Sequence, residues 1–205
     1  MKKLLALVLA LVMSMSLVTI SNAAFKDADK IDYKEAVDVM NAIGVFVGDE
    51  NGNFNAKENL TREQAAKIIA YLELGDKTAD ALVGSNIFTD VASTRWSAGF
   101  VGYCAQAGVV NGVGNGKFAP NATLSLEQLI TILYRYAENK GYNVSKSASL
   151  DSFTDGSAVS AYAKPAMQWA VGMNFLSGNT LTPCAPASRA QIAQVLMLFC
   201  KAYIK

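Results

Sequence analysis

The sequence predicts a mainly α-helical protein in which three similar units pack as one domain. A helix start signal occurs three times, at residues 61–64, 125–128 and 188–191. In each, a Thr or Ser that can cap a helix stands three residues before a Gln that can bond back to it. The starts are 64 and 63 residues apart, and an apolar stripe at helical spacing follows each one. This coincidence in register indicates an internal repeat.

A further helix is expected before each capped one, at residues 33–43, 97–107 and 162–173. Each ends at a residue that tolerates the left-handed backbone of a helix C-terminus, and these residues are Gly44, Gly108 and Asn174. Apolar positions recur at the same offsets from the three caps. We therefore expect one side of each of these helices to face the core.

The segments between the two helices also repeat. A short apolar stretch, expected to be a short strand, follows each cap and closes with a glycine such as Gly48 or Gly112. An Asn-Gly turn comes next in the first two repeats, whereas the third loop is three residues shorter. Each repeat begins with Phe-x-Asp, which contributes Asp27, Asp90 and Asp155.

One such unit cannot bury both faces of its two helices, but three units around a shared centre can. The predicted repeats are residues 24–84, 85–149 and 150–205. The first linker is expected to hold a short extra helix at 78–83, and the second, at 138–152, is expected to be a loop.

Residues 1–23 have the pattern of a secretory signal peptide. Two lysines precede an apolar run at 4–12, and small residues favour cleavage after Ala23, with Ala24 as the alternative. An uncleaved membrane anchor is disfavoured because the run is short. We expect a secreted chain that has no membrane span after cleavage and no room for a further domain.

Charge and residue usage exclude several functions. Cleavage would leave 16 of the 18 basic residues, against 17 acidic ones, so nothing suggests a nucleic-acid-binding face. The chain has no His, and its cysteines (Cys104, Cys184, Cys200) form no CxxC pair, so we expect free thiols, no zinc site and no Cys-His catalysis. Residues 49–60 begin like a calcium loop but lack its Gly and Glu, so no metal or cofactor is predicted.

Several motifs together resemble the S-layer homology family. They are the turn Asn-Gly-Asn-Phe at 51–54, the helix start Leu-Thr-Arg-Glu-Gln at 60–64, and the segment Tyr-Ala-Lys-Pro-Ala-Met-Gln-Trp-Ala at 162–170. The resemblance covers about residues 25–203. It implies a pseudo-threefold domain that attaches to the bacterial cell wall through an anionic secondary polysaccharide, often one with a pyruvate ketal, bound in clefts between neighbouring repeats.

The chemistry of the matched residues suits such a ligand. The guanidinium of Arg62 or Arg189, beside a helix N-terminus with free N–H groups, can pair with a ketal carboxylate. The aromatic face of Trp96 can stack on a sugar, and the three Asp residues can accept sugar hydroxyls. The candidate polysaccharide-binding residues are Arg62, Arg189, Asp27, Asp90, Asp155, Trp96, Thr61, Ser188, Gly48 and Gly112.

Structural roles compete with these assignments. The aspartates can instead cap a helix or turn, Thr61 and Ser188 are first of all N-caps, and Arg62 can be a solvated surface charge. The repeats also differ at one matched position, since Leu126 stands where the other two repeats have arginine. We therefore expect the clefts with Arg62 and Arg189 to bind and the one with Leu126 to be structural.

The function predicted from the sequence is non-catalytic anchoring to the cell wall, with the wall polysaccharide and other surface-layer proteins as partners. One rival is a degenerate surface protein that acts through protein–protein association alone, which Leu126 and the shortened third loop motivate. The other is a wall hydrolase. A glycosidase needs two carboxylates that flank one cleft, whereas Glu63 and Glu127 occupy equivalent positions of separate repeats.

Overall fold

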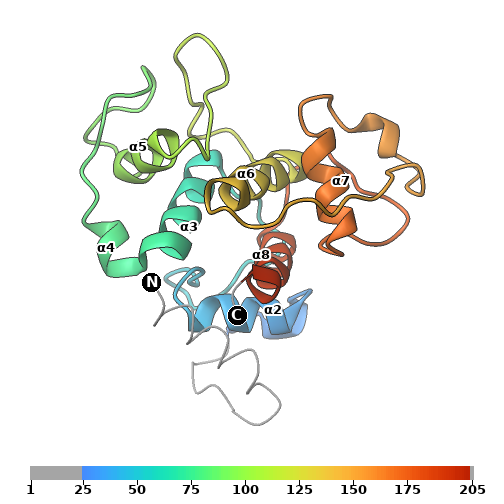
Figure 1. The fold of residues 1–205 in the computed structure, drawn as a ribbon. Helices are drawn as coiled ribbons and strands as arrows, with labels where there is room; N and C mark the ends of the chain where they lie inside the picture. The colour runs from blue at the N-terminus through green and yellow to red at the C-terminus, as the bar shows by residue number, and fades with distance from the viewer. Residues whose placement is uncertain (1–24, 204–205) are drawn as a thin grey trace.

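A computed structural model describes residues 25–203, and the predicted signal peptide lies outside them. Figure 1 shows helices joined by long loops around a common centre. The α-helices of the described residues are α2 (Lys34–Ala42), α3 (Arg62–Leu74), α4 (Asp76–Asp80), α5 (Ala98–Gln106), α6 (Leu126–Asn139), α7 (Lys164–Gly172) and α8 (Arg189–Tyr203). Two single-turn 3-10 helices, η1 (Ala28–Lys30) and η2 (Gly156–Ala158), follow the Phe-x-Asp motifs of repeats 1 and 3.

The three predicted helix starts are confirmed. Thr61 and Ser125 each form a complete capping box, in which the N-cap oxygen accepts the N–H of the Gln three residues on and the Gln side chain accepts the N-cap N–H. Ser188 and Gln191 make the same two bonds, at 3.2 and 3.0 Å. The predicted C-terminal residues Gly44, Gly108 and Asn174 all have positive φ, as expected for left-handed caps.

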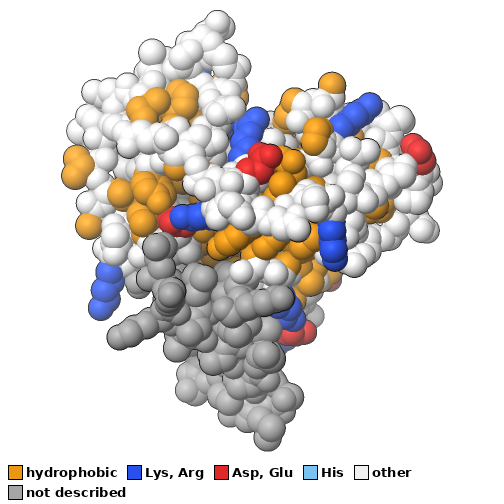
Figure 2. Space-filling view, in the orientation of Figure 1, with side chains coloured by type: hydrophobic (Ala, Val, Ile, Leu, Met, Phe, Trp, Pro, Cys, Tyr) orange, Lys and Arg blue, Asp and Glu red, His pale blue; other side chains and the backbone are white. Residues whose placement is uncertain are grey.

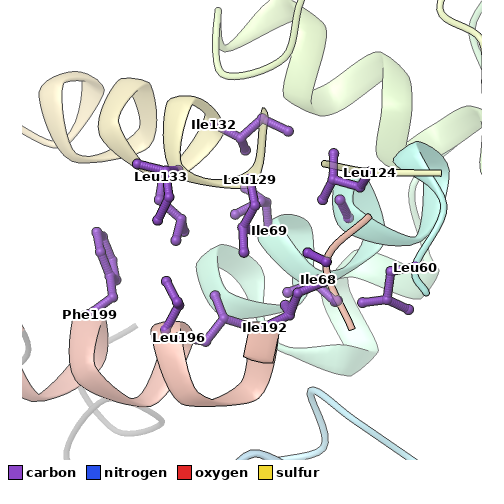
Figure 3. Close-up of a cluster of buried hydrophobic side chains, with 14 of the residues drawn as sticks. Leu60, Ile68, Ile69, Leu124, Leu129, Ile132, Leu133, Ile192, Leu196 and Phe199 are labelled. Carbon is purple, nitrogen blue, oxygen red and sulfur yellow. The ribbon is translucent and has the colours of Figure 1, made fainter. Parts of the chain in front are cut away.

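The core lies where α3, α6 and α8 meet. Figure 3 shows equivalent side chains of the three helices pointing toward one another, among them Ile69, Leu133 and Leu196, each at most 2% exposed. Leu60 and Leu124, just before the N-caps of α3 and α6, close one end of this cluster. Burial of the three apolar stripes against one another is what stabilises the domain.

The first helix of each repeat packs on the capped helix of the repeat before it. Thus α5 packs on α3, α7 packs on α6, and α2, from the start of the chain, packs on α8 at its end. Figure 1 shows the last of these pairs, with blue α2 beside red α8. The repeat in the sequence is therefore not the packing unit, and the third repeat closes onto the first.

Backbone hydrogen bonds close the same ring at its centre. The first two N–H groups of α3 donate to carbonyl oxygens of Ala122 and Pro120, in the loop of repeat 2. The corresponding groups of α6 donate to the repeat 3 loop, and those of α8 donate to the repeat 1 loop. This cyclic pattern confirms one pseudo-threefold domain.

Three local predictions concern the segments between the main helices. The short strands predicted after each cap are absent from residues 25–203. Only isolated bridges occur there, and none of them includes a residue of the three predicted segments, because three of the four join different repeats and the fourth closes the turn at Gly114 and Lys117. In the first linker, a short helix occurs as predicted, but α4 spans Asp76–Asp80 rather than 78–83. In the second, helix α6 ends at Asn139 and a loop follows, as predicted.

Candidate ligand-binding clefts between the repeats

Arg62 reaches from the first turn of α3 into repeat 2. Its Nε donates to the carbonyl oxygen of Phe118 and its Nη2 to that of Asn111, both at 2.8 Å. The guanidinium carbon lies 4.7 Å from the centre of the Phe118 ring. Arg62 is only 8% exposed, which excludes the alternative that it is a solvated surface charge.

The side chain of Arg62 lines a cleft, which we call the Arg62 cleft. Its volume is about 430 Å³, and it lies between the 110–113 loop and helix α6 of repeat 2. Repeat 3 contributes Tyr162, so side chains of all three repeats meet there. The lining residues of α6 are Gln128, Thr131, Ile132 and Arg135. Burial lowers the pKa of Arg62 from its ordinary value, but an arginine stays charged at neutral pH.

An equivalent cleft, the Leu126 cleft, lies one repeat further round the ring. Its volume is about 520 Å³, and it is formed by the 174–182 loop and helix α8 of repeat 3, Leu126 of repeat 2 and Tyr33 of repeat 1. Leu126 takes the place of Arg62, and Tyr33 takes that of Tyr162. The remaining side chains are apolar, amide or hydroxyl groups, so no ionisable acid or base other than the Tyr33 hydroxyl lines this cleft.

Arg189 makes the same kind of contact in the first repeat. Its Nε donates to the carbonyl oxygen of Phe54 at 2.9 Å and its Nη2 to that of Val47 at 2.8 Å. The guanidinium carbon lies 4.7 Å from the Phe54 ring centre, and burial lowers the pKa of Arg189. Trp96 is the residue of the next repeat that corresponds to Tyr162 at the Arg62 cleft. The two side chains are about equally exposed, Trp96 at 53% and Tyr162 at 54%.

Two glutamates position the aromatic side chains, a role the sequence interpretation missed. Buried Glu127 accepts hydrogen bonds from the N–H and Oγ of Ser160 and from the Tyr162 hydroxyl, the last at 2.9 Å. Burial and this bond raise the pKa of Tyr162 to about 12. Glu63 is held equivalently by repeat 2, through two bonds from Arg95 and one from the Ser97 hydroxyl.

The third glutamate position is Ala190, so Tyr33 lacks this partner. The sequence did contain a signal for this contact. A glutamate stands two residues after the N-cap in repeats 1 and 2, and these are the repeats that are followed by Trp96 and Tyr162.

The three predicted aspartates hold the loops that shape the clefts. Asp27 accepts the N–H groups of Phe54 and Asn55, and Asp90 accepts those of Phe118 and Ala119, at 2.7–2.8 Å. Asp155 makes the same pair of bonds in repeat 3. Burial raises the pKa of Asp90, but the two backbone N–H groups outweigh it, so the pKa lies below its ordinary value.

The alternative prediction, that the aspartates cap a turn, is therefore confirmed. Each carboxylate caps the loop that lies across from it rather than the helix that follows it. Contact with sugar hydroxyls stays a prediction for all three.

The two predicted glycines allow close approach within the same loops. A Cβ on Gly48 would lie 2.9 Å from a Phe25 ring carbon and from the carbonyl oxygen of Asn53. A Cβ on Gly112 would lie 2.6 Å from the carbonyl oxygen of Lys117. Gly112 also lines the Arg62 cleft.

One part of the predicted chemistry is wrong. The N–H groups at the start of α3, expected to be free for a carboxylate, are engaged: those of Arg62 and Glu63 donate to the repeat 2 backbone, and that of Gln64 donates to Thr61. Helix α8 is engaged in the same way. The reason is tertiary, because these N–H groups close the ring of repeats. An anion beside either arginine therefore cannot be bound by these helix N–H groups.

The remaining sequence features carry no site among the described residues. Cys104, Cys184 and Cys200 are free thiols, as predicted. Residues 25–203 contain no cluster of potential metal ligands and no helix long and apolar enough to cross a bilayer. On the face drawn in Figure 2, lysine and arginine side chains are scattered rather than gathered into one patch.

A ring of three repeats with clefts between them is the architecture of a repeat-built binding domain. Comparison with known proteins identifies the family of this domain. The S-layer homology domain model matches residues 24–66, 87–130 and 152–193. The chain therefore belongs to the S-layer homology domain family, as the motifs indicated. The matched segments fall one in each predicted repeat, while the exact repeat boundaries stay predictions.

Several curated relatives are named as surface or cell-wall proteins of bacteria, and others are named as enzymes, such as an endoglucanase. The chain is 32% identical over 195 residues to the "Surface-layer 125 kDa protein" of Lysinibacillus sphaericus, covering 91% of this chain and 16% of that protein. It is 31% identical to the "Middle cell wall protein" of Brevibacillus brevis, covering 64% and 13%. It is 28% identical to the "Cellulosome-anchoring protein" of Acetivibrio thermocellus, covering 46% and 21%. The chain thus spans about a fifth or less of these relatives.

Proposed function

We propose that this chain is a non-catalytic anchor that binds an anionic secondary polysaccharide of the bacterial cell wall in the Arg62 cleft and at Arg189. The observation that carries the proposal is the Arg62 guanidinium, held across a repeat junction by two backbone carbonyls at the wall of an open cleft. A cation fixed in this way needs no ordering when a ligand arrives.

The donors left on Arg62 suit a carboxylate. Its two bonds use two of the five N–H donors of a guanidinium, which leaves three for a ligand. A carboxylate can then accept a charge-assisted pair of hydrogen bonds in the partly buried cleft. The Tyr162 ring, the Gln128 amide and the Thr131 hydroxyl offer a sugar its usual partners: a flat apolar surface and neutral polar groups.

The cell-surface location is supported by the family and by the relatives named as surface-layer and cell-wall proteins. A signal peptide at residues 1–23, predicted from the sequence, agrees with secretion. The name of the cellulosome-anchoring relative supports anchoring as the purpose of the domain.

The arrangement of carboxylates supports a binding protein over a hydrolase. Glu63 and Glu127 lie at different repeat junctions, and each is engaged by side chains of the following repeat. A glycosidase needs two carboxylates on opposite sides of one scissile bond, one of them able to donate a proton. Neither glutamate is placed for that chemistry.

Co-sedimentation with purified cell walls tests the anchor. Residues 24–205 should pellet with intact walls, and binding should fall when the secondary polysaccharide is extracted or when Arg62 and Arg189 are both changed to Ala. Circular dichroism should confirm that the variant folds. Binding unaffected by either change contradicts the proposal.

Protein–protein association is the second candidate function. It is favoured by the Leu126 cleft, which is the larger of the two clefts described and is lined by no charged side chain. Pull-down of surface-layer proteins that survives the double arginine substitution but is lost with Leu126→Gln supports this candidate. Loss of that pull-down on extraction of the polysaccharide contradicts it.

A further inference from the structure

The Arg62 cleft contains a second arginine that its equivalents lack. Arg135 lines the cleft from helix α6, almost three turns beyond the N-cap Ser125. The equivalent residues are Tyr71 in α3 and Leu198 in α8, of which Leu198 lines the Leu126 cleft. The second arginine is therefore found in one repeat only, whereas α3 carries Lys67 at the position equivalent to Thr131, with its Nζ 4.8 Å from the Tyr71 ring centre.

Arg62 and Arg135 differ in what holds them. Arg62 is fixed by two carbonyl oxygens and a ring face. Arg135 is half-buried and forms no hydrogen bond or ion pair with any other residue in 25–203. Its side chain is therefore free to reach a ligand that Arg62 has already positioned.

The cleft also lacks an acid to balance the two charges. Of its lining residues only Arg62 and Arg135 are charged. The carboxylates that contact the cleft's neighbours already have partners: Glu127 is bonded to Ser160 and Tyr162, and Asp90 accepts two backbone N–H groups. Two like charges in one partly buried cleft repel each other until an anion enters.

We propose that Arg135 is a second anion contact, so that the Arg62 cleft selects a glycan segment with two negatively charged groups. This rests on the proposed function and adds which ligands that cleft prefers. Arg62 binds the first anion and orients the sugar, and Arg135 then closes on a second anion, a carboxylate or a phosphate, on the same or the next sugar. The site at Arg189 has a tyrosine, Tyr71, in place of this second arginine.

Two synthetic glycosides test the assignment: a methyl hexoside with one pyruvate ketal, and a disaccharide with two. Binding to residues 24–205 is measured by calorimetry, and the arginine side-chain Nε–H signals in NMR spectra report which cleft is occupied. Arg135→Leu copies Leu198 of the Leu126 cleft. Lys146→Leu removes one exposed positive charge outside the clefts and serves as the control.

The wild type should bind the two-ketal probe in the Arg62 cleft at least tenfold more tightly than the one-ketal probe, with a steeper salt dependence. Arg135→Leu should abolish that preference and change one-ketal binding less than twofold, whereas Lys146→Leu should change neither. An unchanged preference in Arg135→Leu overturns the proposal while leaving the anchor intact. Failure of the wild type to bind either probe contradicts the anchor function itself.

Discussion

The Arg62 cleft and the Leu126 cleft have the same frame but opposite character. In both, a loop and a capped helix of one repeat form the walls, a residue next to an N-cap comes from the repeat before, and a tyrosine comes from the repeat after. One cleft carries two arginines, and the other carries no charged side chain. The repeat architecture thus supplies the cleft, and single substitutions decide what it accepts.

The difference extends to what supports the floor of each cleft. The carbonyl oxygen of Phe118 accepts a hydrogen bond from the Arg62 guanidinium. The carbonyl oxygen of the equivalent Leu181 instead accepts one from the Thr182 hydroxyl, at 2.8 Å. The loss of the arginine is therefore matched locally by a new donor. A buried carbonyl without any partner would be costly, so the two changes belong together.

Arg62→Leu should have the largest effect, because it makes the Arg62 cleft resemble the Leu126 cleft without the matching donor. Two charge-assisted bonds are lost, each worth about 1.5–3 kcal/mol, so we expect the free energy of unfolding to fall by about 3–6 kcal/mol. Wall binding should fall about 100-fold as one of two sites is lost. Urea denaturation and wall titration measure the two effects, and a variant as stable as the wild type would show that the carbonyl contacts contribute little.

The reverse exchange should create a third anion site. Leu126→Arg with Thr182→Ala supplies a guanidinium and frees the carbonyl oxygen of Leu181, copying the pair Arg62 and Ala119. The expected result is a rise from two to three bound one-ketal glycosides by calorimetry and about tenfold tighter wall binding. A stoichiometry that stays at two would mean that the frame differs between the clefts more than their linings suggest.

The aspartates that hold the loops of the two clefts, Asp90 and Asp155, should make stability depend on pH in the same way. The pKa of Asp90 and that of Asp155 both lie below the ordinary 3.8. The stability they contribute is therefore present above pH 3.8 and is lost as the pH falls through their folded-state pKa values. Asp90→Asn and Asp155→Asn should each destabilise the protein at pH 7, with the difference from wild type shrinking as the pH falls below 3.8.

Thermal melts across this pH range measure that effect. The two variants should behave similarly, since both carboxylates accept the same pair of backbone N–H groups. A constant destabilisation at every pH would show that the charge of the carboxylate is not what holds the loop.

The smallest expected effect separates the two tyrosines. Tyr162→Phe loses the bond to Glu127 and should lower the free energy of unfolding by about 1–2 kcal/mol. Tyr33→Phe should change it by less than about 0.5 kcal/mol, because Ala190 stands where a glutamate would accept its hydroxyl. Equal losses in parallel urea titrations would indicate that the glutamate contact is not the difference between these clefts.

Much of the fold followed from local rules in the sequence. The capping boxes, the left-handed caps and the inward stripes each depend on residues within a few positions of one another, and the structure confirms them. The short strands were the exception. Their apolar composition suited a strand, but pairing partners for a strand are set by tertiary contacts, and none extends into a ladder in residues 25–203.

The candidate site was predicted less completely. The sequence singled out Arg62 and Arg189 through their motif and noted Leu126 as a departure. It did not predict that the N–H groups beside the arginines are engaged, that the aspartates cap loops across the repeat, or that Glu127 holds Tyr162. Each of these contacts joins segments at least 26 residues apart, where helical spacing carries no information.

The sequence by itself determined the threefold repeat, the helices with their ends, the buried stripes and the family. These are set by backbone propensity, capping and hydrophobic periodicity, which act over one or two helical turns. Only the tertiary structure decided that each first helix packs on the preceding repeat, that the ring closes through backbone bonds, and that three repeats contribute to one cleft. Those choices join residues as far apart as Val47 and Arg189, 142 positions along the chain. They depend on how the three apolar faces are buried together, which no local pattern records.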